Sequence, residues 1–168
     1  MKIAINGFGR IGRLVFRLME EDNYFDVVAI NDLSTPEELA YLLKYDTNHR
    51  NYDKEITYDE ENIIIEGKKV RVYKEMDPTN LPWKELEIDL VFECTGKFTK
   101  EEDAMKHVTA GAKKVLVSAP CKGNVKTVVY NVNDDILDDS DKIVSAASCT
   151  TNCLAPVLKL VDDNFGII

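Results

Sequence analysis

The chain has 168 residues, a formal net charge of −9, 45% hydrophobic residues and 30% charged residues. This length suits one domain, or one domain with part of a second, and it buries enough surface to fold without disulfides or a structural metal. The negative charge and the lack of a lysine or arginine cluster argue against a nucleic-acid partner. No apolar run approaches 18 residues, so we expect no membrane span, and we expect a cytoplasmic protein with reduced thiols.

Short apolar runs alternate with helical patterns along the chain. The expected strands cover residues 2–6, 26–31, 88–93, 115–118, 127–132 and 142–144, and residues 63–70 are expected to form a hairpin. The expected helices cover residues 10–21, 35–43 and 100–110, and a further helix begins near residue 149. This alternation predicts an α/β fold: a mostly parallel sheet with flanking helices and a small antiparallel hairpin insertion.

Two of these helices carry clear sequence signals. The helix over residues 10–21 has apolar residues at helical spacing, which we expect to face the core: Ile11, Leu14, Val15, Leu18 and Met19. The second helix starts with a cap residue, Thr35, then Pro36 in its first turn and acids at its positive end.

A glycine pattern follows the first strand directly. Gly7, Gly9 and Gly12 form a complete G-x-G-x-x-G that opens a helix, and Asp32 ends the next strand 20 residues after Gly12. One glycine permits a sharp turn, one lets the backbone approach a pyrophosphate, and one packs the helix against the strand. The carboxylate of Asp32 is suited to the two hydroxyls of a ribose and repels a 2′-phosphate, which favours NAD over NADP. A glycine-rich turn with a solvated aspartate is the alternative.

Cys149 lies in the polar block Ser148-Cys149-Thr150-Thr151-Asn152-Cys153, between a short strand and a helix. Ser148 is placed to cap this helix, and a thiol in its first turn meets the positive end of the helix dipole, which favours the thiolate. We therefore predict that Cys149 is a nucleophile. Cys153 lies one turn further on; packing is the favoured reading, and a redox disulfide with Cys149 is the alternative.

The other cysteines and the histidines carry weaker signals. Cys94 and Cys121 are expected to be small buried hydrophobes. His107 is expected at a solvated helix position and His49 in a polar loop, and neither has a sequence argument for reaching Cys149. We expect no metal site.

These motifs together resemble glyceraldehyde-3-phosphate dehydrogenase over the whole chain. The stretches that carry the resemblance are residues 5–13, 29–32, 94–96, 111–114, 117–120 and, most specifically, 148–156. The resemblance implies a Rossmann domain that binds NAD. It assigns the cofactor to Gly7, Gly9, Arg10, Ile11, Gly12, Asn31, Asp32, Met76, Thr95, Gly96 and Ser118. Arg10 and Ile11 are implied at the pyrophosphate, and Ser118 with Thr95 and Gly96 at the nicotinamide half. Met76 stands near the adenine where many members have arginine.

The resemblance also implies the chemistry. Cys149 attacks the aldehyde of glyceraldehyde 3-phosphate, and inorganic phosphate, held with the help of Ser148 and Thr150, cleaves the resulting thioester. Residues 1–150 are expected to form the NAD-binding domain, and residues 151–168 to start a catalytic domain that would carry the activating histidine. We expect the chain alone to lack turnover and the full-length parent to be a homotetramer. The alternatives are a stand-alone NAD-binding module and an erythrose-4-phosphate dehydrogenase.

Overall fold

One nine-stranded sheet forms the centre of the computed structural model, which describes residues 1–22 and 24–167. The strands that run parallel are, in sheet order, β5 (Lys68–Tyr73), β2 (Asp26–Asn31), β1 (Lys2–Asn6), β6 (Leu90–Glu93), β7 (Lys114–Val117), β9 (Ile143–Ser145) and β8 (Lys126–Thr127). Beyond β5 the sheet continues with two antiparallel strands, β4 (Asn62–Ile65) and β3 (Ile56–Tyr58). The predicted Rossmann-type sheet with a small antiparallel part is confirmed, although β3 had not been predicted.

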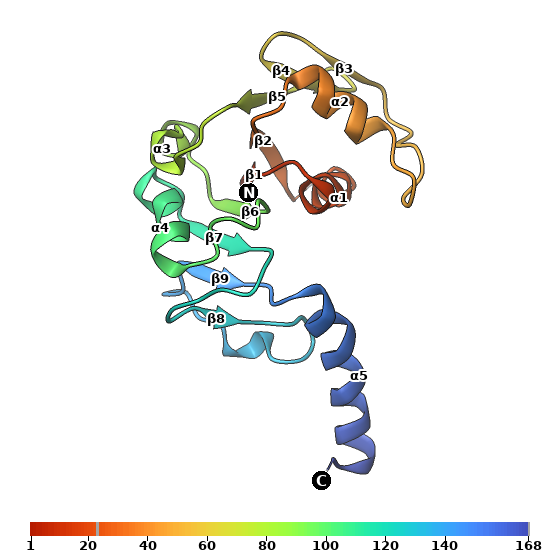
Figure 1. The fold of residues 1–168 in the computed structure, drawn as a ribbon, viewed down its shortest axis with the longest axis vertical. Coiled ribbons are helices and arrows are strands. Elements are labelled where there is room, and N and C mark those ends of the chain that lie inside the picture. Colours follow the sequence, from red (N-terminus) through yellow and green to blue (C-terminus); the bar gives the residue numbers. More distant parts are fainter. Residues whose placement is uncertain (23, 168) are drawn as a thin grey trace.

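Helices cover both faces of this sheet. They are α1 (Arg10–Met19), α2 (Pro36–Lys44), α3 (Trp83–Leu86) and α4 (Glu101–Thr109). The chain also forms α5 (Cys149–Phe165) and short 3₁₀ turns at Pro78–Asn80 and Asp134–Ile136. Figure 1 shows α1 and α2 on one side of the sheet and α3 and α4 on the other, while α5 extends away from both layers.

The alternation of side chains along β1 divides the core into two layers. Ile3 and Ile5 are fully buried and pack with Phe16 of α1 on one face. Ala4 points to the opposite face and belongs to the cluster that contains Trp83 of α3. Successive residues of a strand face opposite sides of its sheet, so a strand buried on both faces reads as a continuous apolar run.

The inward face of α1 differs from the prediction. Ile11 and Leu18 are exposed, whereas Phe16 and Arg17 are buried. The Arg17 guanidinium donates to the backbone carbonyl of Leu43 at the end of α2. Because this hydrogen bond pairs a buried cation with a carbonyl at the end of a helix, an arginine takes a core position that the predicted apolar face does not include.

The start of α2 matches the prediction. The Thr35 side chain accepts from the Glu38 backbone N–H, and the Glu38 carboxylate accepts from that of Thr35. This reciprocal pair is a capping box, which satisfies two of the N–H groups that a helix leaves free at its start.

The strand predicted over residues 127–132 is mostly wrong, because β8 ends at Thr127 and a turn follows. The Asn133 side chain accepts from the Val129 N–H at 2.8 Å and donates to the Thr127 carbonyl at 3.0 Å. The side-chain amide thereby takes the place of the next ladder partners, and the β-branched run continues as a loop.

Candidate cofactor cleft and reactive thiol

The strand order reverses at β1, with β2 and β5 on one side and β6, β7 and β9 on the other. In such sheets ligands bind beyond the carboxyl ends of the strands at this reversal. The glycine turn follows β1, Asp32 follows β2, Thr95 follows β6 and Ser118 follows β7. The fold therefore brings residues from distant parts of the sequence to one edge of the sheet.

Each glycine of the turn has a different surrounding. Gly7 has a φ of +89°, and a Cβ there would lie 2.8 Å from the Thr95 backbone nitrogen. A Cβ on Gly12 would lie 2.2 Å from the Gly7 carbonyl oxygen, so this glycine sets how closely α1 approaches the turn. A Cβ on Gly9 would meet no atom within 4 Å among the described residues, which leaves space for a ligand against the backbone.

The start of α1 faces that space. Gly9 is the N-cap residue, and Arg10 and Ile11 form the exposed start of the first turn. The N–H groups of a first helical turn have no partner within their helix, and the helix dipole adds positive potential there. This end of α1 is suited to a phosphate group.

Asp32 ties the end of β2 to the glycine turn. Its Oδ2 accepts from the Phe8 backbone N–H at 2.8 Å, and its Oδ1 accepts from that of Ser34 at 3.0 Å. A carboxylate has about four acceptor positions. The two acceptor positions that remain on Asp32 are available to ribose hydroxyls, while its negative charge disfavours another anion nearby.

A cavity of about 350 Å³ opens at this edge of the sheet. Its lining combines the glycine turn, apolar side chains and three charged residues: Asn6, Gly7, Gly9, Asn31, Asp32, Leu33, Glu75, Met76, Cys94, Thr95, Lys97 and Phe98. Leu33, Met76 and Phe98 supply apolar surface beside the carboxylate of Asp32, which suits a flat base attached to a ribose. Thr95 lies in this same cavity, whereas Ser118 is outside its lining.

Cys149 is the first residue of α5 and is exposed. Ser148 is the N-cap, as predicted, and its Oγ accepts from the Thr151 backbone N–H at 3.0 Å. The hydroxyls of Ser148 and Thr150, which flank Cys149 in the sequence, lie 2.9 Å apart. The domain boundary expected after residue 150 falls inside this continuous helix.

The prediction of a solvated His107 is wrong, since its side chain is completely buried. Its Nδ1 accepts from the Trp83 indole N–H at 3.0 Å, and its Nε2 lies 3.2 Å from a carboxylate oxygen of Glu93. α4 packs against β7, and the His107 ring stacks on Trp83 of α3, so this side chain lies in the interior. Sequence reasoning missed both Glu93 and His107; a lone carboxylate ending the apolar run of residues 90–93 was the available signal.

The remaining thiols differ in exposure. Cys94 and Cys121 are partly buried among hydrophobic side chains, which agrees with their predicted packing role. Burial raises the pKa of Cys94 to about 11 and also raises the pKa of Cys121. Cys153 is exposed, so the packing favoured for it is not found against the described residues.

This difference predicts a labelling order. With iodoacetamide at pH 8 we expect Cys149 and Cys153 to be alkylated first and Cys94 last, since with a pKa of about 11 only about a thousandth of Cys94 is thiolate at that pH. Peptide mass spectrometry after timed quenching measures the order. Equal rates for Cys94 and Cys149 in the folded chain would contradict the assignment, and full labelling in urea serves as the control.

Within the part of the chain that the structure describes, no helix is long and apolar enough to cross a membrane. The same residues contain no group of three histidine, cysteine or acidic side chains placed to hold a metal ion.

The strand order, the glycine turn and the acid at the end of β2 define a dinucleotide-binding α/β domain. Residues 1–101 match the family described as "Glyceraldehyde 3-phosphate dehydrogenase, NAD binding domain". The chain belongs to this family, and NAD is the cofactor of such domains.

Two curated relatives show the extent of the similarity. The chain is 53% identical to glyceraldehyde-3-phosphate dehydrogenase of Mycoplasma pneumoniae, over 100% of this chain and 50% of the relative. It is 54% identical to the enzyme of the same name from Clostridium pasteurianum, over 99% of this chain and 50% of the relative. The chain thus spans about half the length of the curated relatives that it matches.

Proposed function

We propose that the chain is the NAD-binding part of a phosphorylating glyceraldehyde-3-phosphate dehydrogenase of glycolysis. The observation that carries the proposal is the position of Cys149. This exposed thiol begins α5 directly beyond β9, at the same sheet edge as the glycine turn. A nucleophile and a dinucleotide site on one edge suit an aldehyde oxidation in which an enzyme-bound thioester forms.

The order of the strands supports an order for the cofactor along the cleft. Asp32 would bind the adenosine ribose, with the base between Leu33, Met76 and Phe98 and close to Asn31. Gly7, Gly9 and the start of α1 at Arg10 and Ile11 would hold the pyrophosphate. Gly96 and Ser118 would contact the nicotinamide half, since β7 lies between β6 and β9. The shared cavity of Thr95 and Asp32 favours the adenosine side for Thr95.

The residues of α5 would carry the covalent steps. The Cys149 thiolate attacks the aldehyde carbon and forms a thiohemiacetal. NAD, when bound, supplies the hydride acceptor for its oxidation to a thioester. Inorganic phosphate then attacks the thioester carbon, which releases an acyl phosphate and restores the thiolate. Ser148 and Thr150 would help to hold the phosphate with hydroxyls at the positive end of α5.

Residues 1–168 alone are expected to lack turnover. Among the described residues no hydrogen bond joins Cys149 to a histidine, because His49 bonds to Asp46 and His107 is buried against Trp83 and Glu93. A missing general base typically costs 10²–10⁴-fold in rate. Incubation with glyceraldehyde 3-phosphate, NAD and phosphate should give essentially no NADH at 340 nm.

A chimera tests the proposal positively. Residues 1–168 joined in frame to the remaining half of the Clostridium pasteurianum relative should oxidise glyceraldehyde 3-phosphate in a phosphate-dependent reaction, and Cys149→Ala should remove it. An active chimera with Cys149→Ala would refute the role of the thiol. Full-enzyme rates from residues 1–168 alone would refute the expected inactivity. Oligomer size on gel filtration tests the expected homotetramer, and erythrose 4-phosphate as substrate tests the alternative dehydrogenase.

A further inference from the structure

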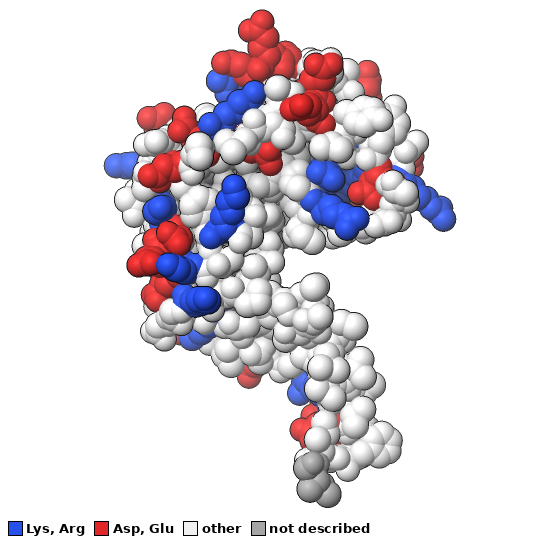
Figure 2. Space-filling view, in the orientation of Figure 1, with Lys and Arg blue, Asp and Glu red and all other residues white. Residues whose placement is uncertain are grey.

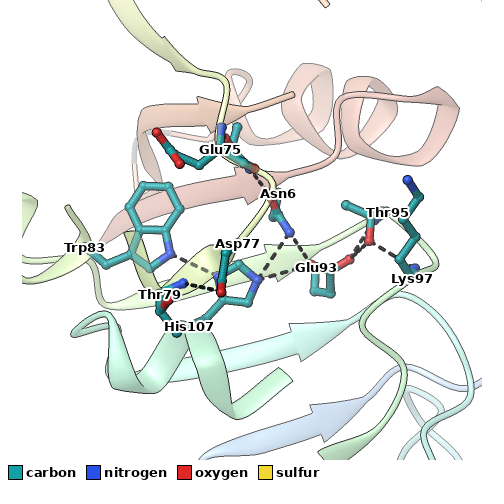
Figure 3. Close-up of polar contacts among 10 residues, drawn as sticks. Asn6, Glu75, Asp77, Thr79, Trp83, Glu93, Thr95, Lys97 and His107 are labelled. Atoms are coloured by element: carbon teal, nitrogen blue, oxygen red, sulfur yellow. Dashed lines mark hydrogen bonds and ion pairs between the residues drawn. The ribbon is translucent and has the colours of Figure 1, made fainter. Parts of the chain in front are cut away.

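A chain of buried polar side chains crosses the sheet beneath the cofactor cleft. We call Trp83, His107, Glu93, Asn6 and Asn31 the Glu93 network; Figure 3 shows its contacts from Trp83 to Asn6. Glu93 is 1% exposed and His107 is fully buried. Neither side chain lines the cavity, so Glu93 can affect a ligand there only through the residues that are hydrogen-bonded to it.

The hydrogen-bond directions are determined at the Trp83 end. An indole N–H can only donate, so Nδ1 of His107 accepts from it at 3.0 Å. An imidazole that accepts at Nδ1 is neutral and carries its proton on Nε2. His107 therefore donates from Nε2 to the Glu93 Oε2 at 3.2 Å and cannot act as its counter-cation.

The hydrogen-bond directions are also determined at the Asn31 end of the network. The Glu75 backbone N–H donates to Oδ1 of Asn31 at 2.8 Å, and Nδ2 of Asn31 donates to the Glu75 carbonyl at 2.9 Å. Nδ2 of Asn31 also donates to Oδ1 of Asn6 at 2.7 Å. Asn6 is thereby oriented with its Nδ2 toward Glu93, to which it donates. Nδ2 of Asn6 also lies 3.3 Å from Nε2 of His107, and since both nitrogens carry protons in this arrangement, each directs its N–H to Glu93 rather than to the other.

Glu93 accordingly accepts four hydrogen bonds. Asn6 and His107 donate to Oε2, and the backbone N–H and hydroxyl of Thr95 donate to Oε1. The Thr95 hydroxyl also accepts from the Lys97 backbone N–H at 3.0 Å, which leaves its proton for Glu93. Only an ionised carboxylate accepts at all four positions. No lysine or arginine within residues 1–22 and 24–167 pairs with it.

Through these bonds Glu93 reaches two walls of the cavity. One wall contains Thr95 and Lys97, and the other contains Asn31 with Glu75 beside Met76. We propose that Glu93 is a positioning residue for NAD: a buried anion that holds both walls at the spacing the cofactor requires. This inference rests on the cofactor site proposed above.

The test is Glu93→Gln, which keeps the shape and removes the charge. A glutamine offers one oxygen and one NH₂, so two of the four donors lose their acceptor and face another donor. We expect the Kd for NAD, measured by calorimetry on residues 1–168, to rise on the order of tenfold, as for one hydrogen bond to a charged group. The exposed Glu102→Gln is the matched control and should leave the Kd within about twofold.

A carboxylate needed only for folding would behave differently. Glu93→Gln would then lower the Tm but leave the Kd of the folded fraction unchanged, and that result would overturn the proposal. Should Glu93→Gln not fold, two His107 variants replace it. His107→Gln offers an N–H near the position of Nε2 and should bind NAD within about threefold of the wild type, whereas His107→Leu should bind more weakly. Equal affinities of these two variants would overturn the proposal.

An error in the proposed NAD site itself would give a different set of affinities. If Asp32→Ala leaves the wild-type NAD affinity unchanged, the proposed cleft is wrong. If Asp32→Ala weakens binding and Glu93→Gln does not, the cleft stands and only the positioning role fails.

Discussion

Gly12→Ala is expected to destabilise the chain by about 3 kcal/mol, at the upper end of overpacking penalties, and to abolish measurable NAD binding. The new Cβ would lie 2.2 Å from the Gly7 carbonyl oxygen and 3.2 Å from the Ile5 side chain. Because the nearest atom belongs to the backbone of the turn, α1 has to move away from it. That movement separates the glycine turn from the start of the helix, where we place the pyrophosphate.

Gly9→Ala is the matched variant, since a Cβ at Gly9 meets no described atom within 4 Å. Its Tm should stay close to that of the wild type, while a methyl group in the proposed pyrophosphate space weakens NAD binding. Urea unfolding and calorimetry on both variants separate the two effects. A Gly9→Ala variant that binds NAD normally would contradict the proposed path of the cofactor, and a Gly12→Ala variant of unchanged stability would contradict the packing.

Asp32→Ala should raise the Kd for NAD by roughly 10- to 100-fold, the loss expected for hydrogen bonds from hydroxyls to a charged group. The preference for NAD over NADP should also narrow, because the carboxylate no longer repels a 2′-phosphate. The Phe8 and Ser34 N–H groups lose their acceptor in the same variant, so the turn loosens as well. Calorimetry with both dinucleotides measures the Kd values and their ratio.

Asp32→Asn separates the local structure from the charge. Its amide oxygen still accepts one backbone N–H, so the turn keeps part of its support, but the negative charge is gone. We expect the preference for NAD over NADP, measured as the ratio of the two Kd values, to fall to a similar extent in Asp32→Ala and Asp32→Asn. The loss of NAD affinity should be smaller in Asp32→Asn. An unchanged ratio in Asp32→Ala would contradict the assignment of this carboxylate to the ribose.

Much of the fold could be predicted because its signals are local. The strand at residues 2–6, the capped helix after Thr35 and the helix that begins at Cys149 each depend on neighbours a few residues away. The end of β8 could not be predicted, since the Asn133 side chain there replaces the expected ladder partners. The prediction of the buried face of α1 was wrong for a similar reason, because Arg17 donates to backbone carbonyls that come close to it only in the folded chain.

A second consequence of folding concerns α5. Its apolar residues Leu154, Val157, Leu158, Val161 and Phe165 are all between 40% and 85% exposed. Figure 2 shows that this helix and the adjoining part of the sheet present a largely uncharged surface on this face. These residues recur at helical spacing and form one apolar stripe, which no described part of the chain covers.

The sequence by itself determined the class of the domain and its cofactor, and it located the candidate thiol, because a glycine turn, a spaced acid and a capped cysteine are local patterns. The tertiary structure alone decided what lies beneath the cleft. Glu93 and His107 are 14 residues apart and Asn6 and Glu93 are 87 apart. Their hydrogen bonds exist only because β1 and β6 are neighbours and α4 packs over β7. A buried charge is recognised by its partners, and distant partners meet only in the folded chain.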